Sequence, residues 1–283
     1  MIDTAFLRQL DRFHLVLKKR VLSNYQGERQ SHAQGSGLTF ADYKDYVPGD
    51  DFRNIDWKVF ARTNKLYIKK YEEERDLSVH IIVDASSSMD YGKQIKKFEY
   101  ASMIGIGFAY MALKNNEKFN FSTFADQLNY FKAKKGMNQL LEIIKRLEKQ
   151  KITGNSKLEG AFEEYKKFMH NKGFVVVISD FLYDLEEIKS VISRFTKHEV
   201  VIIQVLDPEE RKLALYGDVM LEDSEMHTKL RTFISNRLLK NYREKLEGHI
   251  YSIKDACEKM GADFISITSD RPIFEAFYAA LKV

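Results

Sequence analysis

The stretch IIVDASSSMD, residues 81 to 90, joins an apolar run to a cluster of short, oxygen-bearing side chains. The apolar residues lead directly to Asp84, and Ser86 and Ser88 follow it in the spacing D-x-S-x-S. Such an apolar run is typical of a buried strand, and the polar cluster then lies in the loop that leaves it. The stretch therefore predicts a strand that brings one carboxylate and two hydroxyls to the edge of a sheet.

From residue 76 onward, short apolar runs alternate with helical patterns. Strands are predicted at 77–84, 118–125, 174–180, 199–207 and 262–268, and helices at 97–115, 137–150, 157–170, 184–198 and 272–281. This alternation predicts a doubly wound, Rossmann-like α/β domain whose mostly parallel sheet is covered by helices on both faces. In such sheets ligands bind beyond the carboxyl ends of the strands, where Asp84 and Asp180 both lie.

Residues 1–75 differ in pattern from the α/β domain. Apolar residues at three- and four-residue intervals over 1–20 predict an amphipathic helix that packs on the protein's own core rather than on a membrane surface. Pro48-Gly49 is a turn signal, and residues 65–71 alternate like a half-buried strand. We therefore predict an N-terminal helix with a small β subdomain at 1–75, which is either a salt-bridged appendage or a partner-binding surface, and the α/β domain at 76–283.

The composition limits the classes of function. The 45 Lys and Arg and 41 Asp and Glu leave a net charge of +4 that is spread along the chain, without a concentrated basic segment for nucleic acid. The longest apolar run, at 101–113, is too short to span a bilayer, and the start lacks the pattern of a secretory signal. The single cysteine, Cys257, fits a reducing compartment. We predict a cytoplasmic protein with no nucleic-acid partner and no transmembrane segment.

The oxygens of Asp84, Ser86 and Ser88 are hard donors, which favour Mg²⁺, Mn²⁺ or Ca²⁺ over zinc. A second hydroxyl-bearing loop, TGNSKLEG at 153–160, and Asp180 at another strand end complete a predicted divalent-metal site. The alternative is that Ser86 or Ser88 caps the following helix and that Asp84 accepts backbone N–H groups. Nucleophilic or nucleotide chemistry is not predicted, because the sequence has no G-x-S-x-G elbow and no phosphate-binding loop.

The segments DASSSM, GNSKL and VVVISDF resemble the metal-ion-dependent adhesion site of von Willebrand factor type A domains. The resemblance implies a cation held by Asp84, Ser86, Ser88, Asp180 and one hydroxyl of the second loop. In that family the last ligand is a Thr in a G-G-T-[DN]-L setting, which aligns with GNSKL and puts Ser156 in its place. Thr153 is the second choice for this ligand.

Residues 35–76, and above all YVPGDDFRNIDWKVFAR at 46–62, resemble the segment that precedes the type A domain in the bacterial and archaeal domain-of-unknown-function family DUF58. The later stretches VLDPEE and LEDSE are also similar to that family. Its members are typically encoded beside MoxR-type AAA+ ATPases. The resemblance therefore implies a role as the partner or adaptor of such an ATPase.

Two functions of different classes follow from these predictions. The favoured one is a non-enzymatic interaction module whose bound cation offers an open coordination position to an acidic side chain of a protein partner. The alternative is a metal-dependent phosphoester hydrolase, in which the cation activates water. That enzyme would need basic groups to hold phosphate, and the candidates in the sequence are Arg62, Lys93 and Lys96.

Overall fold

The computed structural model describes residues 6, 8–11, 38–73, 78–134, 136–152, 154, 158–169, 172–213, 217–222 and 229–280. These residues fall into two units, a smaller one within 38–73 and a larger one that comprises 6, 8–11 and 78–280. The predicted boundary between residues 75 and 76 lies outside the described residues.

The larger unit is built on a six-stranded sheet with the strand order β10-β7-β6-β3-β4-β5. Its strands are β3 (Ser78–Asp84), β4 (Lys118–Phe124), β5 (Leu128–Lys134), β6 (Gly173–Ser179), β7 (Glu199–Leu206) and β10 (Asp263–Thr268). Neighbouring strands are parallel except for β4 and β5. The predicted doubly wound, mostly parallel α/β fold is confirmed.

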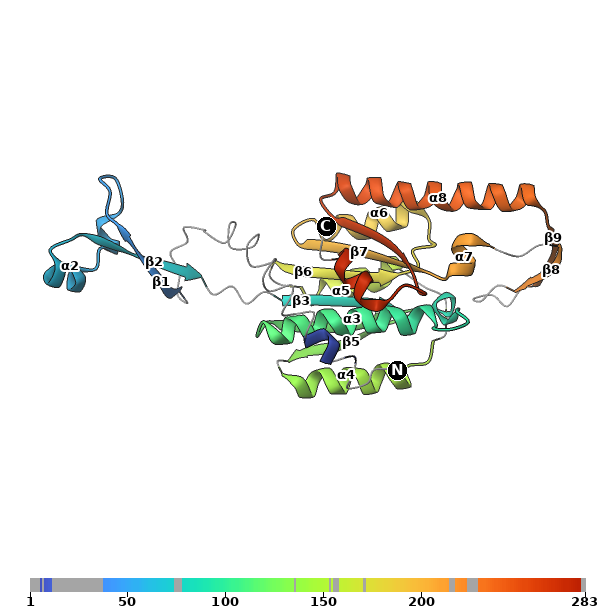
Figure 1. Cartoon of the computed structure of the whole chain (residues 1–283), viewed down its shortest axis with the longest axis horizontal. Coiled ribbons are helices and arrows are strands. Elements are labelled where there is room, and N and C mark those ends of the chain that lie inside the picture. Colours follow the sequence, from blue (N-terminus) through green and yellow to red (C-terminus); the bar gives the residue numbers. More distant parts are fainter. Residues whose placement is uncertain are drawn as a thin grey trace. The chain divides into compact units, whose positions relative to one another are not determined.

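Helices cover both faces of this sheet (Figure 1). One face carries α3 (Lys97–Lys114), α4 (Met137–Lys149) and α9 (Ile273–Ala280), and the other carries α5 (Leu158–Lys166), α6 (Leu185–Ser193) and α8 (Asn236–Lys259). Because successive side chains of a strand point to opposite faces, alternate residues enter the two cores. On the second face, Ile82, Val175 and Val177 pack with Phe162 and Phe195.

Two glycines let α3 pack closely against its neighbours. A Cβ atom on Gly107 would lie 1.8 Å from the ring of Phe277 in α9, and one on Gly105 would lie 2.9 Å from the ring of Phe121 in β4. A side chain at either position would therefore overlap an aromatic ring. This close packing is the role expected for a glycine in the middle of a buried helix.

The chain between β7 and β10 contains elements that were not predicted from the sequence. After α7 (Pro208–Lys212), β8 (Gly217–Glu222) pairs in antiparallel fashion with β9 (Lys229–Ile234), and the long helix α8 follows. The β8–β9 pair exposes large apolar side chains, with Met220 64%, Leu230 63% and Phe233 61% accessible. The edge strand β5 was likewise not predicted.

The described N-terminal residues, 6 and 8–11, are helical and belong to the larger unit. Phe6 is buried with its ring centroid 5.9 Å from that of Phe274, and Leu10 is also buried. The hydroxyl of Tyr110 in α3 donates a 2.6 Å hydrogen bond to Asp11. This segment therefore packs on the protein's own core, and the rest of the helix predicted over 1–20 lies outside the described residues.

The smaller unit contains the antiparallel strands β1 (Leu38–Asp45) and β2 (Tyr67–Glu73), the short helix η1 (Phe52–Asn54) and α2 (Trp57–Thr63). Asp56 organises it, because its carboxylate accepts hydrogen bonds from the Tyr43 hydroxyl and the Lys58 amide, both at 2.9 Å. The side chain of Trp57 is 58% exposed. The described part of this unit therefore consists of one antiparallel strand pair and two short helices.

Candidate metal centre

The strands β3 and β6 place Asp84 and Asp180 at the same edge of the sheet. Asp84 is the last residue of β3, and Asp180 directly follows β6, which is its parallel neighbour. The strand order diverges between these two strands, since β4 and β5 continue on one side and β7 and β10 on the other. Such a switch point is where doubly wound sheets bind ligands.

Asp84 is fully buried and held by hydrogen bonds at both carboxylate oxygens. Its Oδ1 accepts the backbone N–H of Ser86 at 2.9 Å. Its Oδ2 accepts the hydroxyl of Ser179 at 2.6 Å and also the hydroxyl of Tyr183. Burial, together with the charge of Asp180, raises the pKa of Asp84 to about 6 in spite of these donors. A positive charge at this edge would therefore be favourable.

The hydroxyls of Ser86 and Ser88 lie 3.1 Å apart, in the loop that leaves β3. Ser86 stands at the N-cap of the short helix η2 (Ser87–Asp90), but its side chain makes no capping hydrogen bond. The interpretation of these serines as helix caps is thus not supported for Ser86, whereas the backbone N–H bond to Asp84 is present. The loop geometry leaves two hydroxyl oxygens facing each other.

The second loop meets the first at Gly154. The carbonyl of Gly154 accepts both the amide and the hydroxyl of Ser87, each at 3.2 Å. Gly154 has a φ of +99°, and a Cβ there would lie 2.0 Å from the carboxylate of Asp126, so a side chain would not fit. The two candidate ligands of this loop, Ser156 and Thr153, lie outside the described residues.

Asp180 is buried at the end of β6, beside a strained residue. Its Oδ1 accepts the amide of Leu182 at 3.3 Å, and its backbone carbonyl accepts the side chain of Gln204 at 2.8 Å. The next residue, Phe181, has a φ of +49°, which is rare for a bulky side chain, and its ring is buried in the core. Such strained positions concentrate at functional sites.

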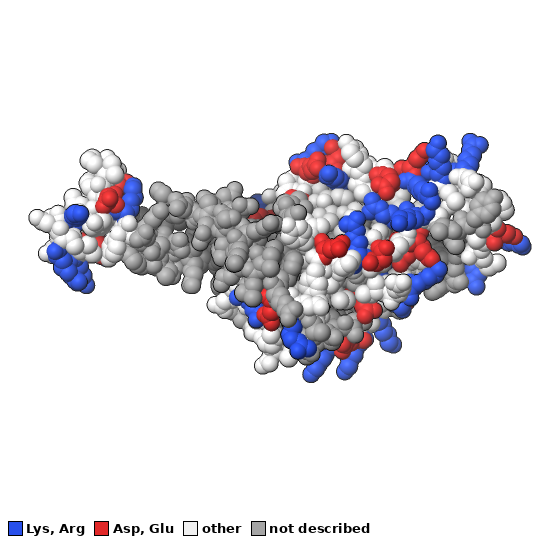
Figure 2. Space-filling model, viewed as in Figure 1, with Lys and Arg blue, Asp and Glu red and all other residues white. Residues whose placement is uncertain are grey.

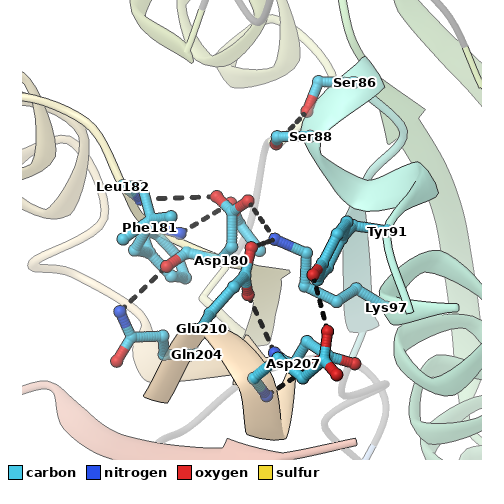
Figure 3. Close-up of polar contacts among 12 residues, drawn as sticks. Ser86, Ser88, Tyr91, Lys97, Asp180, Phe181, Leu182, Gln204, Asp207 and Glu210 are labelled. Carbon is cyan, nitrogen blue, oxygen red and sulfur yellow. Dashed lines mark hydrogen bonds and ion pairs between the residues drawn. The ribbon is translucent and has the colours of Figure 1, made fainter. Parts of the chain in front are cut away.

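A buried ammonium group, that of Lys97, contacts Asp180. Its Nζ lies 2.9 Å from Asp180 Oδ2 and 2.6 Å from Glu210 Oε1 (Figure 3). Burial alone would lower the pKa of Lys97, but the charges of Asp180 and Glu210 outweigh it and raise the pKa. Neither Lys97 nor Glu210 was predicted as a site residue. In sequence Lys97 looks like its neighbours Lys93 and Lys96, and nothing in the pattern marks it as the buried one.

The described residues fit a divalent cation. The paired serine hydroxyls supply hard oxygen donors, and the carboxylates of Asp180 and Glu210 share the ammonium group of Lys97. Among the residues that the structure describes, no group of three or more His, Cys, Asp or Glu side chains is arranged to hold a metal. A cation bound here would therefore use a mixed set of hydroxyl and carboxylate oxygens.

The basic residues considered for phosphate binding are Arg62, Lys93 and Lys96. Lys93 pairs with Glu209, and Lys96 lies 2.7 Å from Asp90, both on the surface of the larger unit. Arg62 belongs to α2 in the smaller unit. In the described part of the larger unit, neither Lys93 nor Lys96 is among the groups that contact Asp84 or Asp180.

A mostly parallel six-stranded sheet, helices on both faces and a D-x-S-x-S loop at the switch point together define a doubly wound α/β domain. The chain belongs to the family described as protein of unknown function DUF58, which matches residues 42–249. The match covers most of the described residues of both units.

Two known proteins similar to this chain share no more than 26% of its residues. A protein of Mycobacterium tuberculosis, described as uncharacterised, is 26% identical over 273 residues, which cover 94% of this chain and 85% of that protein. The von Willebrand factor domain of the type V pili tip protein Mfa5 from Porphyromonas gingivalis is 13% identical, with a TM-score of 0.40, over 73% of this chain and 95% of its own.

The predicted cytoplasmic location is corrected by a further comparison. A protein from Bacteroides fragilis, described as an aerotolerance-related membrane protein, is 16% identical with a TM-score of 0.45, over 73% of this chain and 97% of its own. A cytoplasmic location is therefore no longer assigned. Within the described ranges, no helix is both long and apolar enough to cross a bilayer.

Proposed function

We propose that the protein is a non-enzymatic interaction module that binds a divalent cation at the carboxyl edge of its sheet. The cation is Mg²⁺, with Mn²⁺ or Ca²⁺ as substitutes, and its ligands are Asp84, Ser86, Ser88, Ser156 and Asp180, some of them acting through water. The observation that carries this proposal is the 3.1 Å approach of the Ser86 and Ser88 hydroxyls beside the buried carboxylate of Asp84.

The bound cation would supply a positive charge and a coordination position for an acidic side chain of a protein partner. Hard cations of this kind take several oxygen ligands, carboxylates and water among them, so a coordination position can be open to an outside carboxylate. This chain's own residues would hold the cation and orient its first ligands. Ser179 and Tyr183 support that role, because their hydroxyls both donate hydrogen bonds to Oδ2 of Asp84 and hold its carboxylate in place.

The partner that we propose is a MoxR-type AAA+ ATPase, the class that the sequence resemblance to DUF58 proteins implies. Two apolar side chains next to the site support a protein partner, since Leu182 is 47% and Tyr91 44% exposed. On the face drawn in Figure 2, acidic and basic side chains of the larger unit are interspersed. A protein surface of mixed charge suits that face better than a polyanion.

The alternative function, a metal-dependent phosphoester hydrolase, gains no support from the groups proposed to hold phosphate. Lys93 and Lys96 are each engaged with a neighbouring carboxylate, those of Glu209 and Asp90. An assay of a generic phosphoester with Mg²⁺ distinguishes the two functions. Turnover that disappears in Asp84→Ala would favour the enzyme over the module.

Calorimetric titration with Mg²⁺ tests the proposed site. We expect one binding site in the wild-type protein and none in Asp84→Ala, because that variant removes the carboxylate at the end of β3. Ser193→Ala is the control, since Ser193 lies on the exposed surface of α6 and should leave Mg²⁺ binding unchanged. Equal binding by the wild type and Asp84→Ala would reject the site.

A further inference from the structure

The most unusual charged group of the larger unit is Lys97, whose side chain is 0% exposed. A lysine ammonium loses several kcal/mol of hydration when it is buried, roughly what a well-formed pair of carboxylates can return. Lys97 has such a pair, in Asp180 Oδ2 at 2.9 Å and Glu210 Oε1 at 2.6 Å. Its position is therefore fixed by two acids from different parts of the chain.

Those two acids are themselves fixed. Asp180 follows β6, whereas Glu210 lies in α7, after β7. The second oxygen of Glu210 accepts the amide of Asp207 at 2.8 Å in a capping box, and its backbone carbonyl accepts the hydroxyl of Tyr242 at 2.8 Å. The ammonium of Lys97 thus sits in a rigid frame and cannot leave Asp180 without breaking several contacts.

Asp180 has both carboxylate oxygens engaged in this frame. Oδ2 binds Lys97, and Oδ1 accepts the Leu182 amide. A divalent cation at this edge of the sheet would therefore meet an Asp180 carboxylate whose charge Lys97 already partly neutralises. The ammonium group of Lys97 would also repel the cation. The fixed positive charge acts against the entering metal.

We propose that Lys97 is a positioning residue of the candidate metal centre, a built-in cation that holds Asp180 in place and lowers the affinity of the site for a divalent ion. This inference rests on the proposed metal-binding function. It adds that the chain alone binds the ion weakly, so that a carboxylate from the partner is needed to retain it. Metal occupancy then reports whether the partner is bound.

Substitutions that change charge in opposite directions test this role. Lys97→Met removes the positive charge, and we expect Mg²⁺ to bind at least about ten-fold more tightly, as measured by calorimetry. Glu210→Gln removes a negative charge from the same cluster and should weaken Mg²⁺ binding. Lys97→Arg keeps the positive charge and should stay near the wild-type affinity. A purely structural role for Lys97 would not move the two affinities in opposite directions.

Thermal unfolding provides a second readout. Without metal, Lys97→Met should unfold at a lower temperature than the wild type, because Asp180 and Glu210 lose their shared partner. Added Mg²⁺ should raise the unfolding temperature of Lys97→Met by more than that of the wild type, since tighter binding stabilises the folded state by mass action. If Lys97→Met does not fold, Lys97→Met/Glu210→Gln is compared with Glu210→Gln, and the double variant should bind Mg²⁺ more tightly.

The possible outcomes separate this inference from the function on which it rests. The role of Lys97 alone is overturned if the wild type binds Mg²⁺ and Lys97→Met binds it equally or more weakly. The same conclusion follows if Lys97→Met/Glu210→Gln binds Mg²⁺ no more tightly than Glu210→Gln. Absence of Mg²⁺ binding in the wild type and in every folded variant overturns the metal site, and this inference with it. Binding that is seen only after Lys97 is replaced supports the inference.

Discussion

The hydroxyls of Ser86 and Ser88 face each other at 3.1 Å, while the amide of Ser86 donates to the carboxylate of Asp84. One short loop thereby combines two neutral oxygen donors with a buried acid at the switch point of the sheet. This relationship is the basis of the metal-binding account.

Each of the two hydroxyls should contribute to metal affinity. We expect Ser86→Ala and Ser88→Ala each to weaken Mg²⁺ binding by about ten-fold or more, because each removes a direct oxygen ligand. Isothermal titration calorimetry measures this effect, with Ser193→Ala as the matched control. Wild-type affinity in both loop variants would remove the serines from the ligand set.

The second loop offers Ser156 and Thr153 as its hydroxyl ligand. We expect Ser156→Thr to keep or tighten Mg²⁺ binding, because it restores the ligand type of the adhesion-site family, and Ser156→Ala to weaken it. Thr153→Ala should have little effect in the same titration. If Ser156→Thr abolished binding, Ser156 would not be the ligand.

A pair of helical glycines tests the packing of α3. Gly107→Ala should destabilise the protein by roughly 1–3 kcal/mol, because the added methyl group would overlap the ring of Phe277. Gly248→Ala, in α8, is the matched control. Outside its own turn of the helix, no heavy atom lies within 4 Å of the Cβ position there, so this change should stabilise the helix by about 0.5–1 kcal/mol. Chemical denaturation measures both, and equal stabilities would contradict the packing.

Buried His80 should make stability depend on pH. Its Nδ1 lies 2.8 Å from the Tyr165 hydroxyl, and burial, aided by the nearby His198, lowers its pKa to about 4 from 6.5. Above pH 6.5 the ring is neutral in both the folded and the unfolded state and has no effect. As the pH falls from 6.5 to 4, only the unfolded state takes up the proton, so about 3 kcal/mol of stability is lost.

Comparison with His80→Gln isolates this contribution, because the variant cannot titrate at that position and other groups cancel. Between pH 7 and pH 4, the unfolding free energy of the wild type should fall by about 3 kcal/mol relative to that of His80→Gln. Denaturant titrations at several pH values measure it. A difference that stays constant over this range would show that His80 is protonated in the folded protein.

Much of the sheet could be predicted because its parallel strands are buried on both faces and read as continuous apolar runs, as in β6 and β7. The strands that were not predicted gave weaker signals in the sequence. The β8–β9 pair exposes Met220 and Leu230, so its apolar residues do not mark a buried face. For α8 a signal was present, since Leu246, Ile250, Ile253 and Cys257 recur at helical spacing and are buried.

One part of the candidate site could likewise be predicted from the sequence, and another part could not. Asp84 and Asp180 could be placed together from sequence, because the carboxyl ends of neighbouring parallel strands share one edge. The contact between Lys97 and Glu210 could not, since it joins the start of α3 to α7 across 113 positions of the chain. Local pattern carries no information on such a pair.

The central claim, that a cation at this edge joins the protein to its partner, is tested most directly by the affinity for a purified MoxR-type ATPase in Mg²⁺ and in EDTA. An unpaired or truncated buried charge contact costs roughly 2–5 kcal/mol, so EDTA should weaken the complex by about 30-fold to several thousand-fold, while the protein stays folded in a parallel thermal melt. Equal affinity in Mg²⁺ and in EDTA would contradict the account.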